Sequence, residues 1–79
     1  MANGYRVQTR SEGGVWRTVR TWTDERQARE DARLLAGERR EIEGVMRHGK
    51  PLSIPTHPFV RLMHGQKVAL MFDQNREAV

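Results

Sequence analysis

Two glycine-centred turns, one near each end of the chain, constrain the fold most. Gly13-Gly14 interrupts a segment rich in aromatic and β-branched residues, 5–22, and Gly65-Gln66 interrupts a second such segment, 59–72. Strand-forming residues on both sides of a tight glycine turn are typical of β-hairpins. The sequence therefore predicts a hairpin near each end of the chain.

The middle of the chain has the pattern of one amphipathic helix. Asp24 stands at an N-cap position, and Gln27, three residues later, completes a capping box. Apolar residues then recur at helical spacing as far as Met46. We expect a helix from Asp24 to about Gly49, which either kinks or stops and restarts at Gly37, because glycine is unfavourable inside helices.

Three prolines fall within residues 51–58, which we expect to form an extended connection rather than a helix. The predicted element order is ββαββ. This order indicates an α+β fold in which a four-stranded antiparallel sheet packs against one helix. We expect residues 1–79 to form a single domain whose ends, 1–3 and 73–79, are frayed.

The composition limits the protein class. A chain of 79 residues buries a small core, so oligomerisation or a partner is expected to add burial. No cysteine is present, which excludes disulfides and thiolate-bound zinc and fits a reducing compartment. The longest apolar run, 68–72, is too short to cross a bilayer. We expect a soluble protein of the cytoplasm, or of the host cytoplasm if a phage encodes it.

Two strand registers are open for the first hairpin. A two-residue turn at Glu12-Gly13 puts Tyr5, Val7 and Trp16 on one face. A one-residue bulge at the glycines instead flips the second strand and joins Trp16 and Trp22 to the face that carries the arginines of the first strand.

The second hairpin is expected to have two largely apolar faces. In the register of a two-residue turn, one face holds Phe59, Arg61, Met63, Val68, Leu70 and Phe72. The other face holds Val60, Leu62, Ala69 and Met71, together with His64 and Lys67. One helix covers only one face of a sheet, so we predict that Val60, Leu62, Ala69 and Met71 contact a partner or a second copy.

The net charge of +4 lies entirely outside the middle of the chain, because seven basic and seven acidic residues cancel between Asp24 and Lys50. The first hairpin contains four arginines and one acidic residue, Glu12. We predict that these arginines bind a nucleic acid or a protein partner: Arg6, Arg10, Arg17 and Arg20. Trp16 and Trp22 either stack on bases beside them or belong to the core.

Catalytic and metal-binding signatures are not found in the sequence. His48, His57 and His64 are spaced by 9 and 7 residues, which matches neither a helical ligand pair nor a zinc finger. No nucleophile motif surrounds Ser11 or Ser53. We therefore expect a binding protein that is not an enzyme and has no cofactor.

The order of a Tyr5-x-Val7 hairpin, a helix capped at Asp24-Glu25 and a hairpin from Phe59 to Phe72 resembles small accessory proteins of phages and mobile elements, including anti-CRISPR proteins. The resemblance is architectural, covers about residues 4–72 and transfers no functional residue. It implies a non-enzymatic inhibitor that occupies a surface of a CRISPR effector, a protein or ribonucleoprotein complex. The alternative is a protein that binds nucleic acid directly through a basic sheet face.

Overall fold

The computed structural model describes residues 4–73. In this range the chain forms one helix and six strands, which are β1 (Tyr5–Arg10), β2 (Arg17–Trp22), α1 (Glu25–Gly37), β3 (Arg39–Arg47), β4 (Lys50–Pro55), β5 (Phe59–His64) and β6 (Lys67–Asp73). The α+β class and the four-stranded antiparallel sheet are confirmed, whereas the strict ββαββ order is wrong. Asp73 ends β6 rather than a frayed tail. The expected fraying of 1–3 and 74–79 lies outside the described residues.

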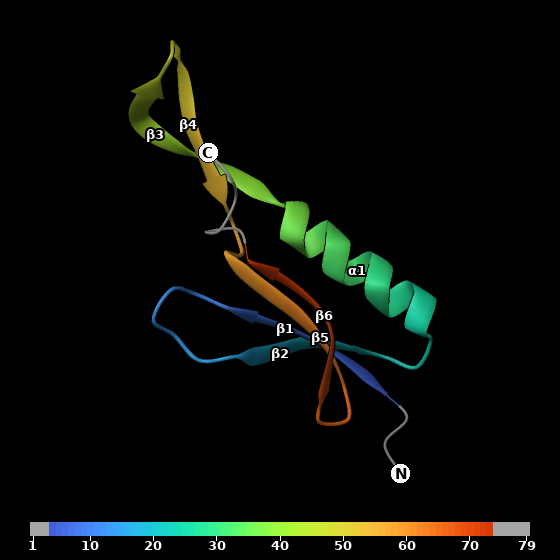
Figure 1. The fold of residues 1–79 in the computed structure, drawn as a ribbon. Helices are drawn as coiled ribbons and strands as arrows, with labels where there is room; N and C mark the ends of the chain where they lie inside the picture. The colour runs from blue at the N-terminus through green and yellow to red at the C-terminus, as the bar shows by residue number, and fades with distance from the viewer. Residues whose placement is uncertain (1–3, 74–79) are drawn as a thin grey trace.

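The four-stranded sheet has the order β2-β1-β5-β6, so the two predicted hairpins lie side by side. Every neighbouring pair is antiparallel, and β1 joins the hairpins by pairing with β5 from Tyr5–His64 to Arg10–Phe59. Helix α1 lies across one face of this sheet (Figure 1). The sheet therefore has a covered face and an open face.

Helix α1 begins as predicted and ends earlier than predicted. The Asp24 carboxylate accepts the backbone N–H of Arg26, and Glu25 lies in the first turn, where its charge suits the helix dipole. The helix ends at Gly37, and Glu38 is already extended. Of the two predicted alternatives, a stop at Gly37 is confirmed, but the expected restart of the helix toward Gly49 is wrong, because residues 39–47 form strand β3.

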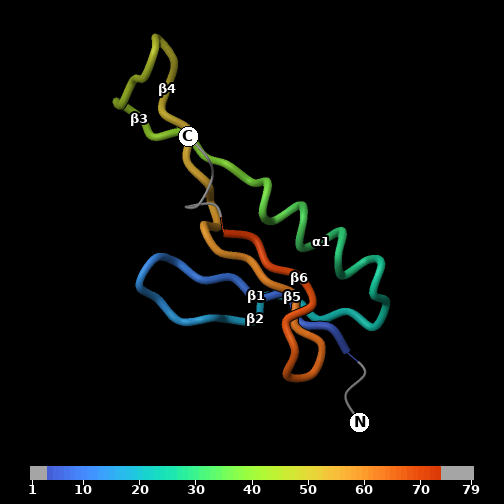
Figure 2. Tube along the Cα trace, in the orientation of Figure 1, coloured from blue at the N-terminus to red at the C-terminus, as the bar shows by residue number. Residues whose placement is uncertain are grey.

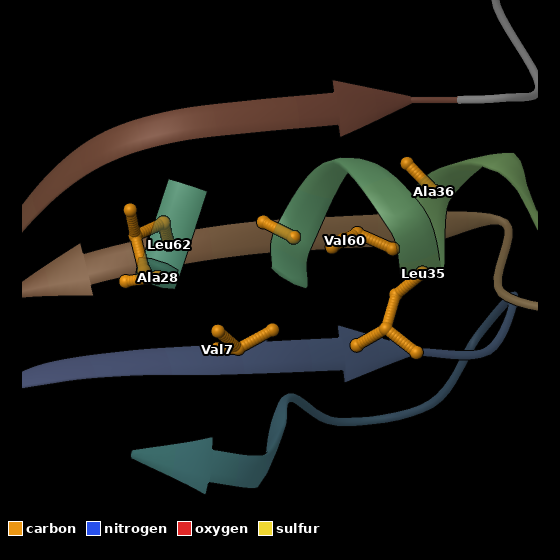
Figure 3. Close-up of a cluster of buried hydrophobic side chains, with 7 residues drawn as sticks. Val7, Ala28, Leu35, Ala36, Val60 and Leu62 are labelled. Atoms are coloured by element: carbon orange, nitrogen blue, oxygen red, sulfur yellow. The ribbon is translucent and has the colours of Figure 1, made fainter. Parts of the chain in front are cut away.

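The core lies between α1 and the two central strands. Val7, Val60 and Leu62 are fully buried in β1 and β5, and Ala28 and Ala32 meet them from the helix (Figure 3). Alanine at these two helical positions lets the backbone of α1 approach the sheet closely. Leu35 and Ala36 extend the cluster toward the end of the helix, and partly buried residues surround it: Tyr5, Trp22, Ala69, Leu70 and Phe72.

Strands β3 and β4 form a separate hairpin that projects beyond the end of α1, away from the sheet (Figures 1 and 2). We call residues 39–55 the arm. The arm gives the described chain its elongated shape, with extents of 51 × 24 × 22 Å. Its two ends meet at a backbone hydrogen bond of 2.9 Å from Thr56 N–H to the Glu38 carbonyl. The expected extended connection at 51–58 is thus largely a paired strand.

A bulge in β2 settles the register of the first hairpin. Val7 pairs with Arg20, but Gln8 pairs with Thr18, so Val19 is an extra residue. After Val19 the even-numbered residues of β2 face the helix, and before Val19 the even-numbered residues face away from it. Trp22 therefore packs against the core while Trp16 lies on the open face, a division that neither expected register contained.

A second bulge corrects the expected faces of the second hairpin. Leu62 pairs with Leu70, but Met63 pairs with Val68, so Ala69 is the extra residue. Leu70 and Phe72 therefore join Val60 and Leu62 on the helix side, and Met71 lies on the opposite side, in register with Arg61. The predicted grouping of Leu70 and Phe72 with Arg61 is wrong because a single bulge exchanges the faces of a strand.

Candidate functional site

The face of the sheet opposite α1 carries a cluster of arginine, aromatic and polar side chains. We call this surface the open face. Its residues either alternate along the strands with the core positions or contact residues that alternate in this way. They are Arg6, Gln8, Arg10, Trp16, Thr18, Phe59, Arg61, Met63 and Met71. The β1–β5 register places Gln8 opposite Arg61 and Arg10 opposite Phe59. Side chains far apart in the sequence are thereby brought onto one surface.

Guanidinium groups and aromatic rings alternate across the open face. The guanidinium carbon of Arg10 lies 4.1 Å from the ring centre of Phe59 and 5.4 Å from that of Trp16. The guanidinium carbon of Arg61 lies 4.2 Å from the Trp16 ring. These are cation–π distances, and they hold long, flexible arginine side chains in a fixed arrangement.

Gln8 fixes this arrangement at its centre. Its side chain is buried, and its Oε1 accepts a 2.7 Å hydrogen bond from Nε of Arg61. Its Nε2 donates a 3.0 Å hydrogen bond to Oγ1 of Thr18 on β2. Gln8 therefore ties strands β1, β2 and β5 together on the open face.

The open face concentrates positive charge. Burial lowers the pKa of the Arg61 guanidinium, and the nearby charges of Arg6 and Arg10 lower it further. Arginine still stays protonated at any physiological pH. Three like charges held close together therefore create a positive potential that attracts an anionic partner.

The structure divides the four arginines predicted to bind a partner. Arg6 and Arg10 lie together on the open face, and Arg6 also donates to the carbonyl of Gly65. Arg17 pairs with Thr9 and is exposed at the start of β2. Arg20 lies on the helix side, in register with Val7.

Arg20 has a structural partner within the protein. Its Nε and Nη2 donate to the two carboxylate oxygens of Asp31 at 2.6 and 2.8 Å, and Trp22 Nε1 donates to the same carboxylate at 2.9 Å. The hydrogen bonds from Arg20 lower the pKa of the Asp31 carboxyl, and the bond to Asp31 raises the pKa of Arg20. This clamp joins β2 to α1, which gives Arg20 a role in the fold.

The second predicted contact surface is not formed as expected. Val60 and Leu62 are fully buried in the core beneath α1, so neither is available to a partner. Ala69 is partly buried at the β6 bulge and packs against the same core. Met71 is 52% exposed, and it is the member of this group that lies on the open face.

The open face includes residues that the sequence analysis did not single out, above all Gln8, Phe59 and Arg61. Arg61 is a charged residue within a largely apolar strand. This departure from the apolar pattern is the sequence signal that could have identified Arg61 as a functional residue. The Gln8–Arg61 pairing depends on β1 meeting β5, which brings together two residues 53 positions apart in the sequence.

A shallow pocket of about 270 Å³ adjoins the open face at the loop between β1 and β2. Arg10 and Arg17 line it from the first hairpin, and Thr56, His57 and Pro58 line it from the segment before β5. His57 Nε2 lies 3.0 Å from a carboxylate oxygen of Glu38. The pocket thus extends the basic surface past the end of the sheet.

Among residues 4–73, no group of three or more His, Cys, Asp or Glu side chains is placed to hold a metal ion. In the same range, no helix has the length and apolar character needed to cross a membrane. Comparison of the chain with models of known families, with curated proteins and with solved structures finds no match.

Proposed function

We propose that the protein binds single-stranded nucleic acid on the open face of its sheet. The observation that carries this proposal is the alternating set of Phe59, Arg10, Trp16 and Arg61, whose guanidinium-to-ring distances are 4.1 to 5.4 Å. Sheet surfaces that bind single strands combine cations for the phosphates with flat side chains for the bases. The open face supplies both.

The chemistry favours a single strand over a duplex. Bases stack on aromatic rings and on guanidinium planes, and the faces of bases are accessible when the strand is unpaired. Arg10 and Arg61 contact phosphates in this proposal, and Arg6 beside them and Arg17 at the adjoining pocket add further phosphate contacts. The bound nucleic acid follows β1 and β5, and Gln8 holds Arg61, at the centre of this path, in place.

The test is binding of labelled single-stranded DNA and RNA, measured by fluorescence anisotropy from about 50 to about 300 mM salt. We expect affinity to fall steeply with salt, because each phosphate contact releases counterions. Arg10→Gln and Arg61→Gln should each lower the slope of log K against log salt by about 0.7. Trp16→Ala should weaken binding by about 1–3 kcal/mol if a base stacks there.

Arg33→Gln is the matched control. Arg33 is exposed on α1, so this variant removes the same charge from the covered side of the molecule. It should leave affinity and salt slope nearly unchanged. Equal losses from Arg33→Gln and Arg61→Gln, or no binding by the unaltered protein at the lowest salt, would contradict the proposal.

One observation favours a second candidate, the anti-CRISPR-like inhibitor that the sequence led us to expect. Arg10 and Arg61 lie over the rings of Phe59 and Trp16, so the open face presents guanidinium groups that meet carboxylates as well as phosphates. Such a face complements an acidic or RNA-containing surface of an effector complex. Absence of binding to free strands, together with inhibition of a CRISPR effector that Arg10→Glu abolishes, would select this candidate.

A further inference from the structure

The arm has no cover, and its outer edge on β3 is unpaired within the described chain. In residues 4–73, β3 pairs with β4 alone, and neither strand belongs to the main sheet. A two-stranded hairpin is marginally stable by itself in water, whereas three or more strands with an apolar face are stable. The arm therefore lacks strands that another molecule would supply.

The two edges of the arm differ in their ability to accept a strand. Strand β4 contains Pro51 and Pro55, which have no N–H to donate, and proline is a common device for blocking an edge. In β3, residues 39–43 contain no proline and precede Gly44, where the backbone turns with a φ of 84°. The register with β4 is regular from Arg39 to Ile42, so the pairing edge of the arm is this first part of β3, with Glu43 at the start of the bulge.

The sequence of this edge complements itself. Residues 39–43 read Arg-Arg-Glu-Ile-Glu, with positive charge at one end and negative charge at the other. We propose that β3 pairs with β3 of a second copy, antiparallel, about a two-fold axis at Glu41. This pairing sets Arg39 of each copy opposite Glu43 of the other copy. Residues of opposite charge that face each other across two strands stabilise a sheet.

Strand alternation is consistent with this register. Arg39 and Glu41 share one face of β3, and Glu43 is the first residue of the bulge that follows Ile42. Arg39 donates two 2.8 Å hydrogen bonds to Ser53 on β4, away from the free edge, and a pair with the second copy's residue 43 replaces these bonds. The like charges of the two Glu41 side chains on the axis oppose the pairing.

The other face of the joined sheet carries an apolar cluster together with Arg40, which pairs with Ile54. Ile42 pairs with Leu52, and Ile54 follows two residues later on the same side. The four strands, in the order β4-β3 and then β3-β4 of the second copy, carry this set twice. Dimerisation thus converts an isolated hairpin into a four-stranded sheet in which Arg40 of each copy lies opposite Ile42 of the other, and the larger number of strands favours its stability.

The proposal does not depend on nucleic-acid binding, and its test is the oligomeric state of the full chain by sedimentation equilibrium over a roughly hundredfold range of concentration. We expect a reversible dimer. Arg39→Glu and Glu43→Arg should each weaken the dimer at least tenfold by opposing like charges, and the double variant should restore it. A monomer at every concentration, or a double variant that dimerises no better than the single variants, overturns the proposal.

Cysteine cross-linking tests the axis directly, since the natural chain has no cysteine. Glu41→Cys places two thiols opposite each other on the axis, within disulfide reach, and should give a covalent dimer on mild oxidation. Ser53→Cys is the control, because the two residues 53 would be three strand spacings apart, roughly 14 Å. Equal cross-linking of both variants, or none for Glu41→Cys, contradicts the two-fold pairing.

Discussion

At the scale of single residues, Asp31 is the polar group on which the packing of α1 against β2 depends most. Its carboxylate is 10% exposed and accepts three hydrogen bonds, two from Arg20 and one from Trp22. Asp31→Ala leaves these donors without their partner in a partly buried position, so we expect a loss of about 2 kcal/mol in the free energy of unfolding. Denaturant unfolding followed by tryptophan fluorescence measures it.

Glu25→Ala is the control for this prediction. Glu25 forms an exposed i,i+4 ion pair with Arg29 at 2.9 Å, which contributes a few tenths of a kcal/mol. A loss from Glu25→Ala as large as that from Asp31→Ala would show that the clamp is not special.

The same carboxylate gives a pH dependence. Hydrogen bonds from Arg20 lower the folded-state pKa of Asp31, whereas the unfolded chain titrates this group in its ordinary range, about 4. The contribution of Asp31 is therefore complete above that range and is lost as pH falls through the lowered folded-state pKa. The stability gap between the unaltered protein and Asp31→Ala should narrow in acid, and a gap that widens there would refute the assignment.

Individual residues also show where prediction from the sequence stopped. Arg6 and Arg10 were placed correctly on the face opposite Tyr5 and Val7, because alternation along one strand is a local property. The positions of Trp16 and Trp22 were not, since a bulge at Val19 gives no signal in the residue pattern. Arg61 was predicted to lie on a strand, but its contact with Gln8 depends on the pairing of β1 with β5, which are far apart in the sequence.

At the scale of elements, the sequence did not reveal the type of turn at the tip of the arm. His48 and Gly49 both have positive φ, 54° and 77°, and they join Arg47 to Lys50, which pair directly. Positive φ at both central residues defines a type I′ turn, which favours Asn-Gly. We expect His48→Asn to protect the amides of the arm more strongly from hydrogen exchange.

The opposite substitution provides the contrast. A β-branched side chain at positive φ costs about 1–3 kcal/mol, so His48→Val should speed exchange throughout β3 and β4. Exchange in β1 and β5 should not change, because the core contains no residue of the arm. Faster exchange across the whole chain would show that the arm and the core unfold together.

The arm is the element that sequence reasoning missed. Ile42 and Met46 fit the helical spacing that begins at Ala28, and so the helix was extended through them. In the structure, Gly37 ends the helix and Gly44 allows three residues of β3 to bulge between Ile42 and Met46. Glycine marked the break correctly, but an apolar spacing of four fits both a helix and a bulged strand.

At the scale of the whole molecule, the arm and the sheet–helix unit are separable. Thr56 N–H and the Glu38 carbonyl are 2.9 Å apart, so a short glycine turn replacing residues 39–55 closes the chain without strain. Every member of the core cluster lies outside the replaced segment. We expect the shortened protein to fold, with a free energy of unfolding within about 1 kcal/mol of the original.

The shortened protein also separates the two proposals. It retains Arg10, Trp16 and Arg61, so it should bind single strands with the same salt slope, yet it should be monomeric at every concentration because β3 is gone. Loss of strand binding with an intact fold would move the binding surface from the open face to the arm. Persistence of a dimer would place self-association on the sheet, where Val19, Val68 and Met71 are exposed apolar residues. One variant, measured by anisotropy and by sedimentation, therefore tests each surface against the other.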